Sequence, residues 1–233
     1  MIVNTALDRT EHSEPAAGRP LLIPVLHTVQ VTSFGGSGTT MLRDWLQEQG
    51  AALPSKHDSG IWKHLPAPPT KDRYQIPEGY KVLYLISDPV ESLLSVFRRG
   101  YHMWHAVRMA SQARWPEGFL LEDHPTRPNW GIKEFLSVRS DCFGIHDHFR
   151  NWTTSHSADR GYPIMVLKYE TMWEHLEEMG AFLGLRTSQV GRFPERRERT
   201  KRDKELEAAR PMLEAIYGDL AGEIREFPGL QVI

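Results

Sequence analysis

Residues 32–41 combine three glycines with several hydroxyl side chains, in the order Thr-Ser-Phe-Gly-Gly-Ser-Gly-Thr-Thr-Met. Glycine lets the backbone turn tightly and approach a ligand closely. Backbone N–H groups at a helix N-terminus bind anions, because these donors are unpaired and the helix dipole favours negative charge there. The stretch follows an apolar run and precedes a helical pattern, so we predict a phosphate-binding loop made of Gly35, Gly36, Ser37, Gly38, Thr39 and Thr40. The loop is not a Walker A sequence, because Thr39 stands where that pattern has lysine.

A second set of reactive groups consists of the neighbouring residues Lys63 and His64. Imidazole titrates near neutral pH and accepts a proton readily, so His64 is a candidate general base. The ammonium group of Lys63 is suited to stabilising a phosphate. The plainer interpretation is that both side chains belong to a surface loop bounded by Pro66.

The remaining histidines do not form a metal-binding pattern. They lack carboxylates or further thiols at ligand spacing, and the chain has a single cysteine. The sequence therefore predicts no metal site among His102, His105, His124, His146 and His148.

Apolar runs and turn residues indicate the elements that position these groups. Residues 28–33, 80–86 and 163–169 predict strands, and the last two are apolar enough to be buried on both faces. Residues 60–66 predict a further short strand that runs into a proline-rich loop. Strand–loop–helix units repeat along the chain, so we expect an α/β fold with a three-layer, mostly parallel sheet flanked by helices.

Helix signals follow each predicted strand. One helix follows the glycine loop and stops at Gly50, and another starts at Asp88-Pro89. A capping box at residues 171–174 predicts the start of a helix that ends at Gly184. Further helical segments are predicted at residues 133–136, 146–152 and 206–224, and Pro211 either kinks the last segment or opens a second helix.

We expect a flexible N-terminal arm over residues 1–24 and a single domain over residues 25–233. Residues 101–142 are rich in Trp, His, Pro and Arg with little periodicity, which is typical of an insertion that forms a lid or an acceptor pocket. Trp104, Trp115 and Trp130 are its candidate pocket residues.

The composition excludes several protein classes. The 233 residues are 40% hydrophobic and 25% charged with a net charge of −2, which is typical of a globular protein and gives no global attraction to nucleic acid or anionic membranes. There is no apolar run long enough to span a membrane. One cysteine excludes an internal disulfide and favours the cytoplasm.

The order of these motifs resembles the sulfotransferases that use 3′-phosphoadenosine 5′-phosphosulfate (PAPS). The similarity lies in four stretches in the family's order: residues 37–40, 63–66, 84–95 and 168–170. The resemblance implies a P-loop-like nucleotide-binding fold, PAPS as sulfuryl donor, adenosine 3′,5′-bisphosphate (PAP) as product, and no metal. It also implies that the 5′-phosphosulfate lies on residues 37–40, that His64 is the base, and that Ser87, Ser95 and Tyr169 belong to the nucleotide site.

Two positions depart from the family's pattern. The family has a basic residue where Gly36 stands and an arginine where Ser87 stands. Each lost charge-assisted contact weakens anion binding by about 1.5–3 kcal/mol. Other cations are therefore candidates to replace them: Lys63, Arg98, Arg99, Arg196 and Arg197, the last two opening a basic run that ends at residue 202.

The sequence thus predicts a sulfotransferase that acts on a small-molecule or glycan acceptor, with no nucleic-acid or membrane partner and with a homodimer left open. Two alternatives remain. A P-loop kinase or nucleotide hydrolase would use Asp88 as a Mg²⁺ ligand. A non-catalytic nucleotide-binding relative would account for the missing charges at Gly36 and Ser87.

Overall fold

A four-stranded sheet forms the centre of the chain. The computed structural model describes residues 22–55, 62–108, 130–196 and 203–233. The strands β2 (Val29–Thr32), β4 (Lys81–Ile86) and β5 (Ile164–Lys168) run parallel, and β6 (Leu230–Val232) pairs antiparallel with β5. Their order in the sheet is β2-β4-β5-β6. The predicted α/β class and mostly parallel sheet are therefore confirmed.

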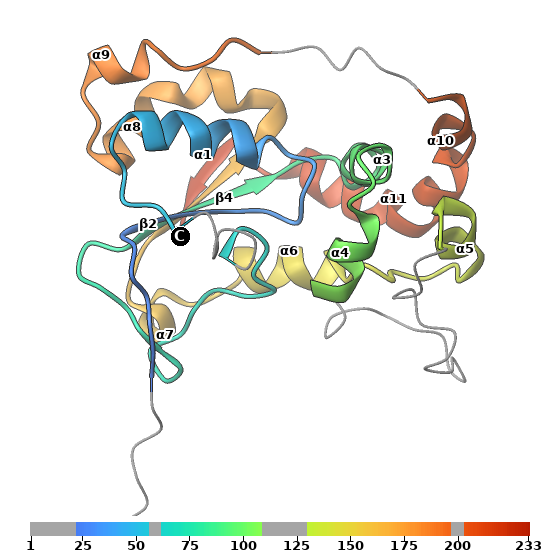
Figure 1. Cartoon of the computed structure of the whole chain (residues 1–233), viewed down its shortest axis with the longest axis horizontal. Helices are drawn as coiled ribbons and strands as arrows, with labels where there is room; N and C mark the ends of the chain where they lie inside the picture. Colours follow the sequence, from blue (N-terminus) through green and yellow to red (C-terminus); the bar gives the residue numbers. More distant parts are fainter. Residues whose placement is uncertain (1–21, 56–61, 109–129, 197–202) are drawn as a thin grey trace, which may run out of the picture.

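Both faces of this sheet are covered by helices (Figure 1). Alternate residues of β4 point to opposite faces, which is why its sequence is apolar throughout. Leu83 and Leu85 pack with α1 (Thr39–Glu48) and α8 (Leu176–Leu183). Val82, Tyr84 and Ile86 pack with the cluster that includes α3 (Pro89–Arg98), α6 (Ile145–Thr153) and α11 (Arg210–Glu226). The predicted three layers follow from these two apolar clusters.

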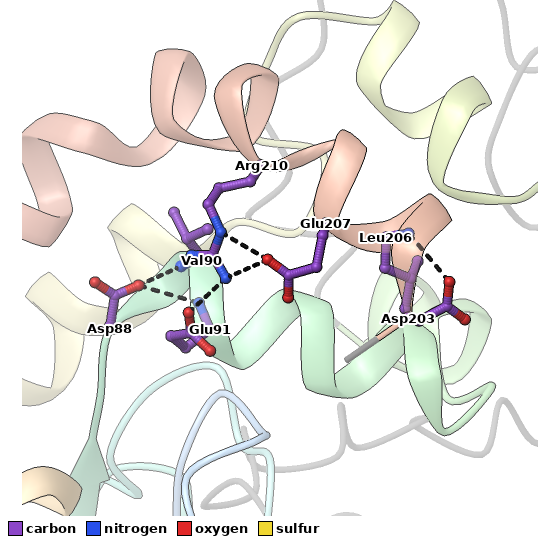
Figure 2. Close-up of polar contacts among 7 residues, drawn as sticks. All are labelled: Asp88, Val90, Glu91, Asp203, Leu206, Glu207 and Arg210. Carbon is purple, nitrogen blue, oxygen red and sulfur yellow. Dashed lines mark hydrogen bonds and ion pairs between the residues drawn. The ribbon is translucent and has the colours of Figure 1, made fainter. Parts of the chain in front are cut away.

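The turn from β4 into α3 is fixed by a side-chain cap, as the Asp88-Pro89 pair predicts. One carboxylate oxygen of Asp88 accepts hydrogen bonds from the backbone N–H groups of Val90 and Glu91, at 2.9 and 3.0 Å. Figure 2 shows this cap beside Arg210, which donates to Glu207 and forms an ion pair of 2.8 Å with Glu91. Arg210 therefore joins the start of α3 to α10 (Lys204–Ala208) and α11.

Two local predictions are wrong. The strand predicted over residues 60–66 is absent from its described part, because Trp62 is helical, residues 63–64 form a turn, and the carbonyl oxygens of Trp62 and Lys63 accept from side chains of β2. Gln30 donates to the Trp62 carbonyl and Thr32 to the Lys63 carbonyl. The capping box is wrong as well, because residues 169–175 form the 3₁₀ helix η2 (Tyr169–His175) and α8 begins only at Leu176.

The chain after residue 203 resolves the role of Pro211. The segment consists of two helices, α10 and α11, and the proline stands in the first turn of the second. Gly184, with φ of 74°, ends α8 as predicted.

Short elements complete the described part. A small parallel pair, β1 (Ile23–Pro24) and β3 (Tyr74–Gln75), takes up the end of the predicted N-terminal arm. Residues 1–21 lie outside the described residues. The remaining helices are α4 (His102–Arg108), α5 (Ile132–Ser137), α7 (Ser157–Arg160) and α9 (Thr187–Val190). None of the described helices has the length and apolar character required to cross a bilayer.

Candidate functional site

A pocket of about 410 Å³ opens where the glycine loop meets the N-terminus of α1. Its wall consists of the loop, the turn that carries Lys63 and His64, the end of α3, and α4. A volume of this size is within the range of small-molecule and cofactor sites. The lining residues are Gly35, Gly36, Gly38, Thr39, Thr40, Lys63, His64, Arg99, Tyr101, Trp104, His105 and Arg108.

The three glycines of the loop have backbone angles and neighbours that require glycine. Gly35, Gly36 and Gly38 have φ of 139°, 76° and 77°. A Cβ on Gly35 would lie 2.4 Å from the ring of His105, and one on Gly38 would lie 2.5 Å from the ring of Tyr169. The loop is thus held between α4 at its first glycine and η2 at its last.

Gly36 faces the backbone of α3. A Cβ there would lie 2.6 Å from the carbonyl oxygen of Ser92 and 2.8 Å from its Cα. The basic side chain that the sulfotransferase pattern has at this position would therefore collide with α3 instead of entering the pocket. Gly36 is a packing requirement of this chain, and a cation must come from elsewhere.

We expect Gly36→Ala to lower the free energy of unfolding by about 2 kcal/mol or more, because the new Cβ adds a backbone collision to the cost of a positive φ. Gly79→Ala is the matched control, since Gly79 has φ of 72° and nothing within 4 Å of its Cβ position. Urea unfolding of the two variants measures the difference. Equal losses of stability would show that Ser92 gives way without cost.

The N-terminus of α1, which has no side-chain cap, and a lysine form a corner that can bind an anion, called the anion-binding corner below. Gly38 caps α1 without a side-chain hydrogen bond, and the first turn holds no acidic residue. The Nζ of Lys63 donates to the Oγ1 of Thr40 at 2.6 Å. Burial, together with Arg43 and Arg99, lowers the pKa of Lys63 to about 8. Lys63 therefore brings a positive charge to the glycine loop, at the α1 end.

His64 is buried, and its ring is oriented by the backbone. Its Nδ1 lies 2.9 Å from the carbonyl oxygen of Ser33. A carbonyl only accepts, so Nδ1 carries the hydrogen and Nε2 keeps its lone pair. Burial and the nearby His105 hold the pKa of His64 well below its usual value. The ring is therefore neutral near pH 7 and able to accept a proton at Nε2.

The helix α4 supplies the opposite wall. His105 lies with its ring centroid 4.6 Å from that of His64, edge to face. Burial and the cations Arg108 and Arg99 lower the pKa of His105 to about 3. Tyr101, His105 and Arg108 follow the i, i+4, i+7 spacing of one helix face, a signal that could have located α4 in the sequence. The sequence singled out Arg99 and Trp104, but not Tyr101, His105 or Arg108, as site residues.

Several predicted site residues do not line this pocket. The Oγ atoms of Ser87 and Ser92 lie 2.6 Å apart, and Ser37 and Ser87 line a separate small cavity behind the loop. Ser95 lies on α3 one turn before Arg99, whose Nε donates to the Ser95 carbonyl. Ser37, Ser87 and Ser95, which were predicted to belong to the nucleotide site, therefore lie outside the lining of this pocket.

Of the three remaining predicted nucleotide residues, the structure describes Tyr169 and Arg196, and neither lines the pocket. Tyr169 touches Gly38 and packs edge to face on Trp173, with centroids 5.4 Å apart. The guanidinium of Arg196 lies 5.8 Å from the Trp173 ring centroid. Arg197 and the rest of the basic run lie outside the described residues.

Two further histidines of the described chain contact separate polar partners. His102 lies 2.9 Å from the carbonyl oxygen of Trp130, and His148 lies 3.0 Å from the hydroxyl of Tyr84. Within residues 22–55, 62–108, 130–196 and 203–233, no group of three or more His, Cys, Asp or Glu side chains is arranged to hold a metal ion.

Comparisons with protein-family models, with curated proteins and with solved structures find no match to this chain.

Proposed function

We propose that the chain is a sulfotransferase that moves a sulfuryl group from PAPS to a hydroxyl or amine of a small-molecule or glycan acceptor. The supporting observation is that one pocket joins the open N-terminus of α1, the ammonium group of Lys63 and the neutral imidazole of His64. These are the groups that sulfuryl transfer requires: a site for the phosphate, a charge to stabilise it, and a base for the acceptor.

Each residue has a defined task in this reaction. The N–H groups at the start of α1 and the Nζ of Lys63 bind the 5′-phosphate and stabilise the charge that grows on it. The Nε2 of His64 takes the acceptor proton. The acceptor oxygen or nitrogen forms a bond to sulfur while the bond from sulfur to the phosphate oxygen breaks, and PAP leaves with that electron pair. The carbonyl of Ser33 holds the ring of His64 in place during the transfer.

The proposal for the donor has its support at the 5′ end. Thr39, Thr40 and Lys63 lie together at that end of the pocket. The contacts of the 3′-phosphate with Ser87 and Ser95 rest on the family resemblance alone, because neither residue lines the pocket. The cytoplasm remains the proposed compartment, on the single cysteine of the chain.

A P-loop kinase is less well supported. Asp88, its candidate Mg²⁺ ligand, uses one carboxylate oxygen to cap α3. Thr39 occupies the position of the lysine that such enzymes place on the phosphates.

Thermal unfolding with PAP, with ATP and Mg²⁺, and without ligand separates these functions. A ligand present at about 100 times its dissociation constant stabilises the folded state by about 2.7 kcal/mol. We expect PAP to raise the melting temperature more than ATP and Mg²⁺ do. Stabilisation by ATP and Mg²⁺ alone would contradict the proposal. Binding of PAP without sulfuryl transfer to any acceptor of a broad panel would favour a non-catalytic relative.

A further inference from the structure

The side of the pocket formed by α4 and the end of α3 contains cations and exposed rings. Arg99 and Arg108 are its charged residues, and none of the described residues that line the pocket is acidic. Trp104 and Tyr101 are 64% and 52% exposed. Exposed aromatic side chains offer a surface on which a ring can pack, and arginines offer donors to an anion, so this side of the pocket can hold a ring that carries a negative charge.

The position of this wall follows from the glycine loop. The loop touches His105 of α4 at Gly35 and leads into α1 after Gly38. The anion-binding corner at the start of α1 and the wall formed by α4 therefore lie at opposite ends of the loop. The ring of His64 contacts the ring of His105, so the base lies next to the α4 wall.

In-line transfer places the acceptor at this wall. The leaving phosphate oxygen, the sulfur and the acceptor atom lie on one line, with the acceptor within hydrogen-bond reach of the base. In this arrangement the start of α1 and Lys63 bind the phosphate, so the acceptor lies on the side of His64. The residues of the pocket that follow His64 on this side belong to α4.

The charges of the wall act on this region. Arg108 and Arg99 both disfavour the protonated form of His105, and Arg108 does the same for His64. Arg108 is itself partly buried, and burial lowers its pKa. No ion pair joins Arg108 to a carboxylate in the part of the chain that the structure describes. An anion bound beside Arg108 would offset a positive charge that forms no ion pair with a carboxylate of the described residues.

We propose that the acceptor is itself an anion: a hydroxyl-bearing ring compound whose acidic group binds Arg99 and Arg108 and whose ring packs on Trp104. The inference rests on the proposed function, since it assigns the acceptor of that reaction. The acceptor hydroxyl gives its proton to Nε2 of His64 and its oxygen bonds to sulfur as PAP departs, while the acidic group remains on the arginines unchanged.

Calorimetry with matched pairs of probes tests this inference. Each pair consists of an acid and its uncharged amide on the same ring: 4-hydroxybenzoate and 4-hydroxybenzamide, 4-hydroxyphenylacetate and its amide, and glucuronate and glucuronamide. We expect at least one acid to bind about tenfold or more tightly than its amide, because Arg–carboxylate contacts are charge-assisted. The titrations are run with and without saturating PAP, so the preference is measured whether or not PAP binds.

The arginine variants assign the preference to the wall. In Arg99→Gln/Arg108→Gln we expect acid and amide to bind with equal affinity, while the affinity for PAP falls by much less than the affinity for the acid. Arg192→Gln, at an exposed arginine outside the pocket, should leave both affinities unchanged. The inference is wrong if no acid of the set binds more tightly than its amide. It is also wrong if the double variant loses PAP affinity as strongly as acid affinity, since the arginines would then bind the nucleotide.

Discussion

His64→Ala is expected to reduce sulfuryl transfer by about 10²–10⁴-fold and to leave the affinity for PAP nearly unchanged, because the variant removes a neutral proton acceptor and no charge. The rate is measured at saturating PAPS with any acceptor that the protein turns over. PAP affinity is measured separately by calorimetry. A loss confined to the rate assigns His64 to the chemical step.

Two further variants make this result specific. His64→Asn keeps a side-chain N–H group that can donate to the Ser33 carbonyl but offers no base, so it should be as inactive as alanine. His156→Ala replaces an exposed histidine outside the pocket and should keep full activity. Normal turnover by His64→Asn would exclude His64 as the base and leave it a structural role.

The pH dependence follows from the same contact. Burial and His105 hold the pKa of His64 well below 6.5, so the base is deprotonated throughout the neutral range. The acid limb of kcat/KM should therefore lie well below pH 6.5 in a pH–rate profile.

The sheet could be predicted because its strands have a clear sequence signal. Residues 80–86 are apolar on both faces, and the structure places β4 at the centre of the parallel strands with helices on either side. β6 was missed for the converse reason: only Leu230 of its three residues is partly buried, while Gln231 and Val232 are exposed. A three-residue edge strand contains too little pattern to distinguish it from a loop.

The sequence indicated several residues of the candidate site, but not how they are arranged in space. The glycines, Lys63 and His64 were identified from their residue types. Gly36 was interpreted only as a position from which a basic side chain is missing. The structure shows a glycine required by the carbonyl of Ser92, a contact between the loop and α3 that no local pattern reveals. Ser87 is a different case, since its hydroxyl bonds to Ser92 five residues later, within the turn from β4 into α3.

The wall formed by α4 could not be predicted from the sequence, because the position of this helix depends on tertiary contacts. Its seven residues hold two histidines, a tryptophan and an arginine, with only His105 and Ala106 buried. A helix with so small an apolar face is stabilised by what it packs against, here Gly35 and His64.

Lys63→Met is expected to weaken binding of PAP and PAPS by about 10- to 150-fold, the equivalent of about 1.5–3 kcal/mol for a charge-assisted hydrogen bond, and to lower kcat/KM by more. The lysine donates to Thr40 at the start of α1, where the departing phosphate would gain charge in the proposed reaction. Methionine keeps roughly the length of the lysine side chain and removes its ammonium group. Lys133→Met, at a lysine side chain that is 78% exposed, is the control and should change neither quantity.

The titration of Lys63 gives this prediction a second readout. The pKa of Lys63 is lowered to about 8, so the free protein holds the positive charge below that pH and loses it above. The kcat/KM value should therefore fall as pH rises through about 8, whereas the alkaline limb of kcat should lie higher, since a bound anion raises the pKa of a neighbouring ammonium group. Lys63→Arg keeps its charge beyond this range and should lose the limb near pH 8, even if its different shape lowers the rate. If Lys63→Arg retained that limb, another group would be its source, and the charge at the glycine loop would have to be assigned again.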